Sequence, residues 1–198
     1  ITGVVLITAA CVVTPRAGDP NSTIMDRALI NVDRLVQGQA PTPGQICFVS
    51  YYKVNEVPKR EDVMRGLKPL VDKFERFRSI PVPKSNFVES YWVPWGKKDV
   101  DWDYHITVHD NVEGGMAGLE RKANEIMNQL VDSNYPLWRV DIINLAPHTY
   151  EGEGENTKQI GGVTVTRCHH AIGDGLRLVG AFGGTSLTFL DGSPAQLE

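Results

Sequence analysis

The sequence predicts an α/β fold in the layered α+β style. Segments whose apolar residues recur three and four positions apart, as in helices, alternate along the chain with short β-branched and aromatic segments typical of strands. Hydrophobic residues make up 41% and charged residues 22% of the 198 residues, which is ordinary for a globular protein with a core. Mixed helices and strands of this kind pack as layers around that core.

In the first half of the chain, residues 46–54 (ICFVSYYKV) have the composition of a strand, and residues 61–77 have the apolar spacing of an amphipathic helix. Pro69 falls inside this helix, so we expect a kink there. The other expected elements of this half are a short helix over 25–36, a Pro/Gly loop over 38–44 and a strand over 87–93.

The second half continues the alternation. We expect strands over 104–108, 137–145 and 162–168, helices over 115–131 and 175–182, and a polar loop over 147–159. His105 and His109 fall on or beside the first of these strands, where a spacing of four does not bring two side chains together, so we expect no metal ligation by this pair.

Residues 1–23 form an apolar segment and a linker. Residues 1–13 carry no charge, but as a helix they would span only about 20 Å of a ~30 Å bilayer core. Three interpretations stay open: the end of a longer membrane helix, part of a signal segment, or a buried strand. Pro15 and Pro20 then interrupt any regular element, and residues 24–198 are expected to form one domain.

Charge and cysteine content exclude several classes of function. The net charge of −4 gives no reason to expect a nucleic-acid partner. Cys11, Cys47 and Cys168 lie far apart and show no zinc-ligand spacing, so we expect neither a disulfide framework nor a structural metal. Cys168 is expected to be a buried cysteine at a strand end, and the four tryptophans are expected to be core or lipid-facing anchors.

The most informative motif is the HHAIGDG segment at residues 169–175, which directly follows a predicted strand. Histidine titrates near neutral pH, so His170 could accept the proton of an attacking hydroxyl as a general base. Asp174 could orient a histidine or pair with Arg139 or Arg167, and the glycines on either side of it permit a tight turn. A metal site is the alternative, but further ligands at suitable spacing are lacking.

HHAIGDG matches the HHxxxDG signature of the CoA-dependent and carrier-dependent acyltransferase superfamily. Its context resembles the wax ester synthase/diacylglycerol acyltransferase family: PLWRVDII at 136–143 resembles the segment upstream of the signature, and WDYHI at 102–106 resembles an earlier strand. The 61–81 segment, with Arg76, Phe77 and Arg78, resembles that family's first long helix. A carrier-dependent condensation or acetyl-transfer enzyme would share the signature but lacks the PLW context.

The resemblance implies the N-terminal half of a two-half enzyme, each half related to chloramphenicol acetyltransferase, with a mixed sheet flanked by helices and a tunnel between the halves. It implies that His170 is the general base, that His169 is a secondary catalytic contributor, and that Asp174 is mainly structural. Gly175 would lie near the substrate, and Trp138 and Arg139 would support the site. Acyl-CoA and a lipid alcohol would be substrates, and no metal or cofactor is implied.

Two functional hypotheses follow. The first is an O-acyltransferase that moves a fatty acyl group from acyl-CoA to a long-chain alcohol or diacylglycerol. It would act at a cellular or organellar membrane, or otherwise in the cytoplasm. Members of the resembled family are longer than this chain, so a C-terminal half or a separate partner chain would have to complete the site. The second hypothesis is therefore a non-catalytic structural or binding subunit of a larger assembly, with a membrane assembly as one option.

Overall fold

The computed structural model describes residues 44–83, 90–96, 100–150 and 160–172. Its centre is a four-stranded mixed sheet with the strand order β1-β6-β5-β4. The antiparallel pairs are β1 with β6 and β6 with β5, whereas β5 and β4 are parallel. The strands are β1 (Gln45–Lys53), β4 (Ile106–Val112), β5 (Trp138–Leu145) and β6 (Ile160–His169). The expected layered α/β fold is confirmed.

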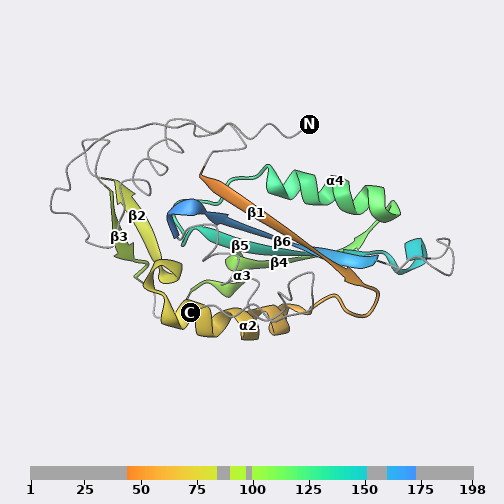
Figure 1. Ribbon diagram of the computed structural model, residues 1–198, viewed down its shortest axis with the longest axis horizontal. Helices are drawn as coiled ribbons and strands as arrows, with labels where there is room; N and C mark the ends of the chain where they lie inside the picture. Colours follow the sequence, from red (N-terminus) through yellow and green to blue (C-terminus); the bar gives the residue numbers. More distant parts are fainter. Residues whose placement is uncertain (1–43, 84–89, 97–99, 151–159, 173–198) are drawn as a thin grey trace, which may run out of the picture.

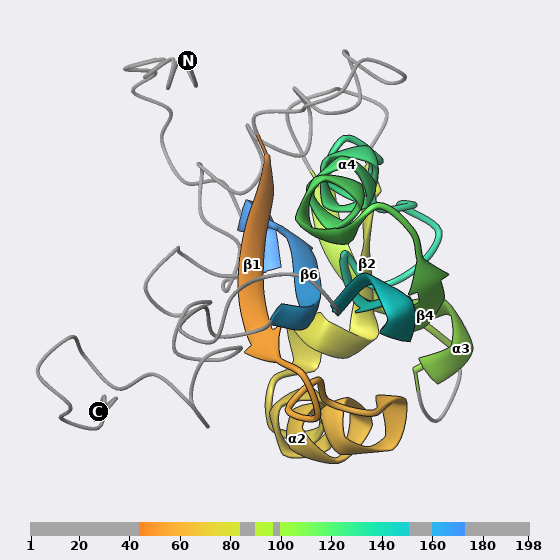
Figure 2. The ribbon, with the colours of Figure 1, turned by 90° about the vertical axis from the view of Figure 1, so that its right-hand side faces the viewer.

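One helix covers each face of the sheet, as Figures 1 and 2 show: α2 (Arg60–Lys73) lies on one side and α4 (Gly115–Met127) on the other. From α2, Leu67 and Val71 belong to a buried cluster with Trp138 and Cys168 of the sheet. A second cluster joins α4 to the opposite face through Leu119, Ala123, Ile126, Val163 and Val165. Because both faces are covered, β6 is buried from Gly161 to His169.

The helix expected over residues 61–77 ends earlier, at Lys73, and it continues through Pro69. Phe74 takes an extended backbone, and a short 3-10 helix, η1 (Glu75–Arg78), follows. This break turns Phe77 into the core, where its ring lies 6.1 Å from that of Trp138. Burial of one large aromatic ring therefore outweighs continuation of the helical pattern.

A two-stranded antiparallel sheet, β2 (Ser79–Pro83) with β3 (Ser90–Pro94), lies beyond one end of the main sheet (Figure 1). The strand predicted over 87–93 corresponds to β3, and β2 was not predicted. Pro81 and Pro83 weaken the strand pattern of β2 because proline cannot donate to a ladder. A two-stranded sheet tolerates them because each of its strands is an edge.

The strand expected over 104–108 is wrong in its first residues. Residues Trp102–His105 form a helical turn, α3, and β4 begins only at Ile106. Asp101 explains the difference, because its side chain accepts a hydrogen bond of 3.2 Å from the Tyr104 backbone N–H and so caps the turn.

The strands expected over 46–54, 137–145 and 162–168 are confirmed as β1, β5 and β6, and the helix over 115–131 is confirmed as α4, which ends at Met127. Gly118 lets α4 approach the preceding loop, since a Cβ there would lie 1.8 Å from the Glu113 carbonyl oxygen. The loop expected from 147 begins with a 3-10 helix, η2 (Pro147–Tyr150). No helix within the described ranges is long and apolar enough to cross a membrane.

Several predictions fall outside the described residues: the 1–23 segment and its boundary with 24–198, the helix over 25–36, most of the 38–44 loop, and the helix over 175–182. These stay predictions.

Candidate active site

The histidine pair lies at the end of β6, the strand that pairs with both β1 and β5 (Figure 1). His169 is the last residue of the strand and is in register with Gln45 of β1. His170 then opens a short 3-10 helix, η3 (His170–Ile172). Pairing with β1 and β5 thus holds the strand on both sides as far as its end. The backbone of His170 therefore continues from a fixed strand.

The His169 side chain is buried, with 7% of its surface exposed, and it holds the turn that follows. Its Nδ1 accepts a hydrogen bond of 3.0 Å from the Ala171 backbone N–H. An Nδ1 that accepts must be unprotonated, so a neutral His169 carries its proton on Nε2. Its backbone N–H donates to the Leu137 carbonyl at 2.9 Å. His169 therefore ties the turn to the strand end.

His170 differs from its neighbour in exposure. It is partly exposed, whereas His169, Ala171 and Ile172 are buried. Its backbone N–H donates to the Gly44 carbonyl at 2.6 Å, while neither ring nitrogen makes a hydrogen bond within the described part of the chain. His170 thus combines an anchored backbone with a partly exposed imidazole.

A further anchor reaches this turn from η1. The Arg76 guanidinium donates from Nη1 to the Ala171 carbonyl oxygen at 2.8 Å. The Trp92 ring lies 5.5 Å from the same guanidinium and packs against the buried cluster beneath the turn. Ile172 belongs to that cluster as well. The 3-10 turn is therefore fixed by main-chain, side-chain and apolar contacts.

The remaining motif residues, Gly173, Asp174 and Gly175, lie outside the described residues. The predicted pairing of Asp174 with Arg139 or Arg167 therefore stays a prediction. Both arginines have other contacts. Arg167 makes an ion pair with Asp141 at 2.8 Å, and Arg139 donates to the Thr107 hydroxyl at 2.7 Å and lies 4.6 Å from the Tyr104 ring centre.

Asp141 is the centre of a buried polar group on the α4 side of the sheet. Its Oδ2 accepts from Arg167, which is fully buried, and its Oδ1 lies 3.0 Å from the Nε2 of His109. Arg167 also donates to the Gln129 carbonyl at 2.9 Å. Gln45 donates to that carbonyl and to the Met127 carbonyl, so both side chains hold the segment that follows α4. This group joins β1, β6, β5 and β4 beside His169.

His105 and Trp138 form a buried stack on the other face of the sheet. Their rings lie 4.0 Å apart at 19°, and the His105 Nδ1 is 2.7 Å from the Trp138 carbonyl oxygen. Burial lowers the pKa of His105 to about 4, so the ring is neutral at pH 7 and donates from Nδ1 to the carbonyl. Trp138 in turn donates from its indole to the Phe77 carbonyl at 3.0 Å.

His105 and His109 do not meet as ligands, because one stacks on Trp138 and the other pairs with Asp141. No cluster of metal-ligating side chains occurs within the ranges that the structure describes. Cys168 is fully buried at the strand end, as expected, and burial raises its pKa to about 12, which argues against a thiolate nucleophile.

Sequence reasoning missed Asp141 and Arg76. Asp141 had a signal: an aspartate inside the apolar segment WRVDIINL requires a buried partner. Arg76 was named only for its place in the segment that resembles the family's first long helix, and its contact with Ala171 joins residues 95 positions apart.

The fold is similar to that of condensation domains. The chain superposes on the starter condensation domain of rhizomide synthetase with a TM-score of 0.54 at 14% identity, over 86% of this chain and 39% of that one. At this level of identity the likeness concerns the fold alone.

In sequence, the chain is similar to two curated proteins of Arabidopsis thaliana. It is 28% identical to wax ester synthase/diacylglycerol acyltransferase 4 over 120 residues, which is 59% of this chain and 20% of that protein. It is 26% identical to wax ester synthase/diacylglycerol acyltransferase 3 over 145 residues, 70% of this chain and 26% of that protein. No family model matches the chain. These similarities support the resemblance seen in the motifs, and the chain spans about a quarter or less of each relative.

Proposed function

We propose that the protein is an O-acyltransferase that moves a fatty acyl group from acyl-CoA to the hydroxyl of a long-chain alcohol or diacylglycerol. The observation that carries the proposal is the state of His170. Its backbone is anchored at the end of β6, and its ring is partly exposed and makes no hydrogen bond within the described residues. The names of the two Arabidopsis relatives supply the reaction class.

In the proposed reaction, a ring nitrogen of His170 takes the proton of the acceptor hydroxyl. The oxygen attacks the thioester carbonyl carbon, the carbon–sulfur bond breaks, and the CoA sulfur leaves with the proton returned by His170. An ester and free CoA are the products, so atoms and charge balance without a metal or cofactor. General-base assistance of this kind typically contributes about 10²–10⁴-fold to the rate.

His169 is proposed to support the turn and not to act as the base. Its Nδ1 is engaged by the Ala171 N–H, and its side chain is buried, so an acceptor hydroxyl would reach His170 more readily. We propose further that Asp174 stabilises the turn and that Gly175 lies beside the substrate. Trp138 and Arg139, at the start of β5, are proposed to support the site from the strand next to β6.

Both proposed acceptors partition into membranes, so we propose that the reaction takes place at a membrane surface. We also propose that a second acyltransferase-like half, in the same chain or in a partner, completes the site. The support for this is that the matched stretch is 20% and 26% of the two relatives.

The test uses the complete protein that carries this chain, with radiolabelled palmitoyl-CoA and either hexadecanol or dioleoylglycerol. His170→Gln should lower ester formation by about 100-fold or more without changing the thermal unfolding midpoint. The matched control is His148→Gln, since His148 is exposed and its Nε2 lies 2.9 Å from the Glu113 carboxylate, away from the histidine motif in the sequence. A wild-type protein that binds acyl-CoA but forms no ester would favour the binding-subunit hypothesis.

A further inference from the structure

We propose that Arg76 is a positioning residue for His170, acting through the carbonyl of Ala171. The inference rests on the proposed role of His170 as base, and it concerns how the imidazole is held in place. Arg76 lies in η1, the short 3-10 helix that follows α2, whereas His170 follows β6. The contact therefore joins two separate parts of the fold.

The contact itself is well defined. Arg76 Nη1 lies 2.8 Å from the Ala171 oxygen, and the guanidinium is half-buried beside the Trp92 ring. A hydrogen bond from a charged donor is roughly twice as strong as a neutral one. Partial burial also limits competition from water for the carbonyl.

The segment that carries Arg76 is fixed by its own hydrogen bonds. The Trp138 indole donates to the Phe77 carbonyl at 3.0 Å. The backbone N–H of Trp95 donates to the Arg78 carbonyl at 2.9 Å. The Ser79 hydroxyl donates to the Glu75 carbonyl at 2.9 Å. Arg76 therefore reaches the turn from a segment that is itself held in place by hydrogen bonds.

The turn is held from two directions. On the strand side, the N–H of His170 bonds to Gly44 and the N–H of Ala171 bonds to His169. On the other side, Arg76 holds the carbonyl of Ala171. Without the guanidinium, the peptide group after Ala171 gains freedom to rotate, and the Cα of His170 loses one of the restraints that set the direction of its ring.

A base displaced by about 1 Å can lose about 100-fold in rate, because the proton and the acceptor nitrogen no longer align. Substrate binding would change little, since Arg76 acts through the main chain of the turn. The predicted signature is therefore a fall in kcat of about 10- to 100-fold, with KM for acyl-CoA changed less than about twofold.

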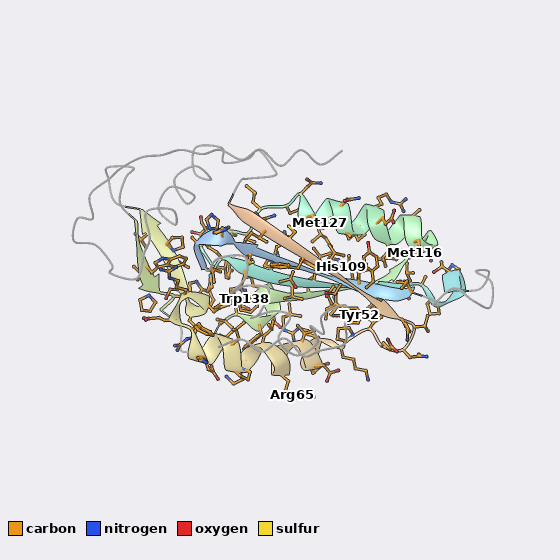
Figure 3. All side chains as sticks on the ribbon, in the orientation of Figure 1. Tyr52, Arg65, His109, Met116, Met127 and Trp138 are labelled. Carbon is orange, nitrogen blue, oxygen red and sulfur yellow. The ribbon has the colours of Figure 1, made fainter. Side chains whose placement is uncertain are left out.

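The principal variant is Arg76→Met, which keeps an unbranched stem beside Trp92 and removes the donor. Arg76→Lys retains one charged donor and should recover part of kcat. Arg65→Met is the matched control, because Arg65 lies on the outer side of α2 and its side chain is 77% exposed (Figure 3). Equal kcat for Arg76→Met and Arg65→Met would overturn the proposal.

A second readout does not depend on turnover. The NMR signal of the His170 ring Hε1, assigned by its absence in His170→Gln, should shift or broaden in Arg76→Met while that of His148 stays unchanged. An unchanged His170 signal in folded Arg76→Met would also overturn the proposal. If the wild-type protein forms no ester but the His170 signal responds, the proposed function fails and the positioning role stands.

Discussion

The buried His105 predicts a specific loss of stability at acidic pH. Its ring stacks on Trp138 and has no exposed surface. Burial is the largest cause of its lowered pKa, and the nearby positive charge of Arg139 adds to it. Protonation in the folded state would place a charge in the apolar cluster that holds α2 against the sheet.

The sign follows from comparing the two states. The pKa of His105 falls from 6.5 to about 4 on folding, so between these values the unfolded chain binds a proton that the folded chain does not. Above pH 6.5 the ring is neutral in both states, so the free energy of unfolding has its full value there. It declines as the pH falls from 6.5 toward 4. Each tenfold change in proton affinity corresponds to about 1.4 kcal/mol, which gives a loss of about 2 kcal/mol at pH 5 and about 3 kcal/mol in total.

The test compares urea unfolding of the wild type and His105→Phe, followed by tryptophan fluorescence at pH 7.5 and pH 5. Phenylalanine keeps an aromatic ring beside Trp138 but does not titrate. It loses the hydrogen bond to the Trp138 carbonyl at both pH values, so only the pH-dependent difference between the proteins reports the ionisation. The wild type should lose about 2 kcal/mol more than the variant between the two pH values. Parallel losses within about 0.5 kcal/mol would refute the reasoning.

Two further predictions concern other buried groups. Asp141→Asn leaves the buried Arg167 guanidinium without its carboxylate, so the free energy of unfolding should fall by about 3–5 kcal/mol in urea titrations. Asp110→Asn, at an exposed position on β4, is its control, and similar unfolding midpoints for the two variants would contradict the assigned ion pair. Cys168, with its pKa raised to about 12, should resist iodoacetamide at pH 8 in the folded protein and react in urea; equal rates in both states would contradict its burial.

The strands at the centre of the sheet could be predicted because burial on both faces leaves a direct signature. The segments that become β5 and β6 are rich in β-branched residues: β5 carries Val140, Ile142 and Ile143, and β6 alternates valine and threonine over residues 163–166. α2 and α4 were likewise visible from the spacing of their apolar residues. Elements whose form depends on a contact elsewhere in the chain were less visible.

Two of three errors, at α2 and β2, share that cause, whereas the error at α3 has a local one. α2 ends at Lys73 because Phe77 is buried against Trp138, a residue 61 positions away. α3 depends on one capping side chain, Asp101, and is only four residues long. β2 contains two prolines and forms only because β3 pairs with it.

The sequence predicted that His170 lies at the end of a strand, but not the contacts that hold it there. The motif placed His170 at the end of a strand, where the structure has it. The tautomer of His169 and the reach of Arg76 come from hydrogen bonds within the folded chain, which no local spacing encodes. The role of Asp174 still rests on the motif.

The most direct test of the central claim is ester formation by His170→Gln in the complete protein that carries this chain. The account predicts transfer from palmitoyl-CoA to a lipid alcohol by the wild type, retained transfer by His148→Gln, and a loss of about 100-fold or more in folded His170→Gln. Ester formation by His170→Gln at the wild-type rate would contradict the claim that His170 is the base.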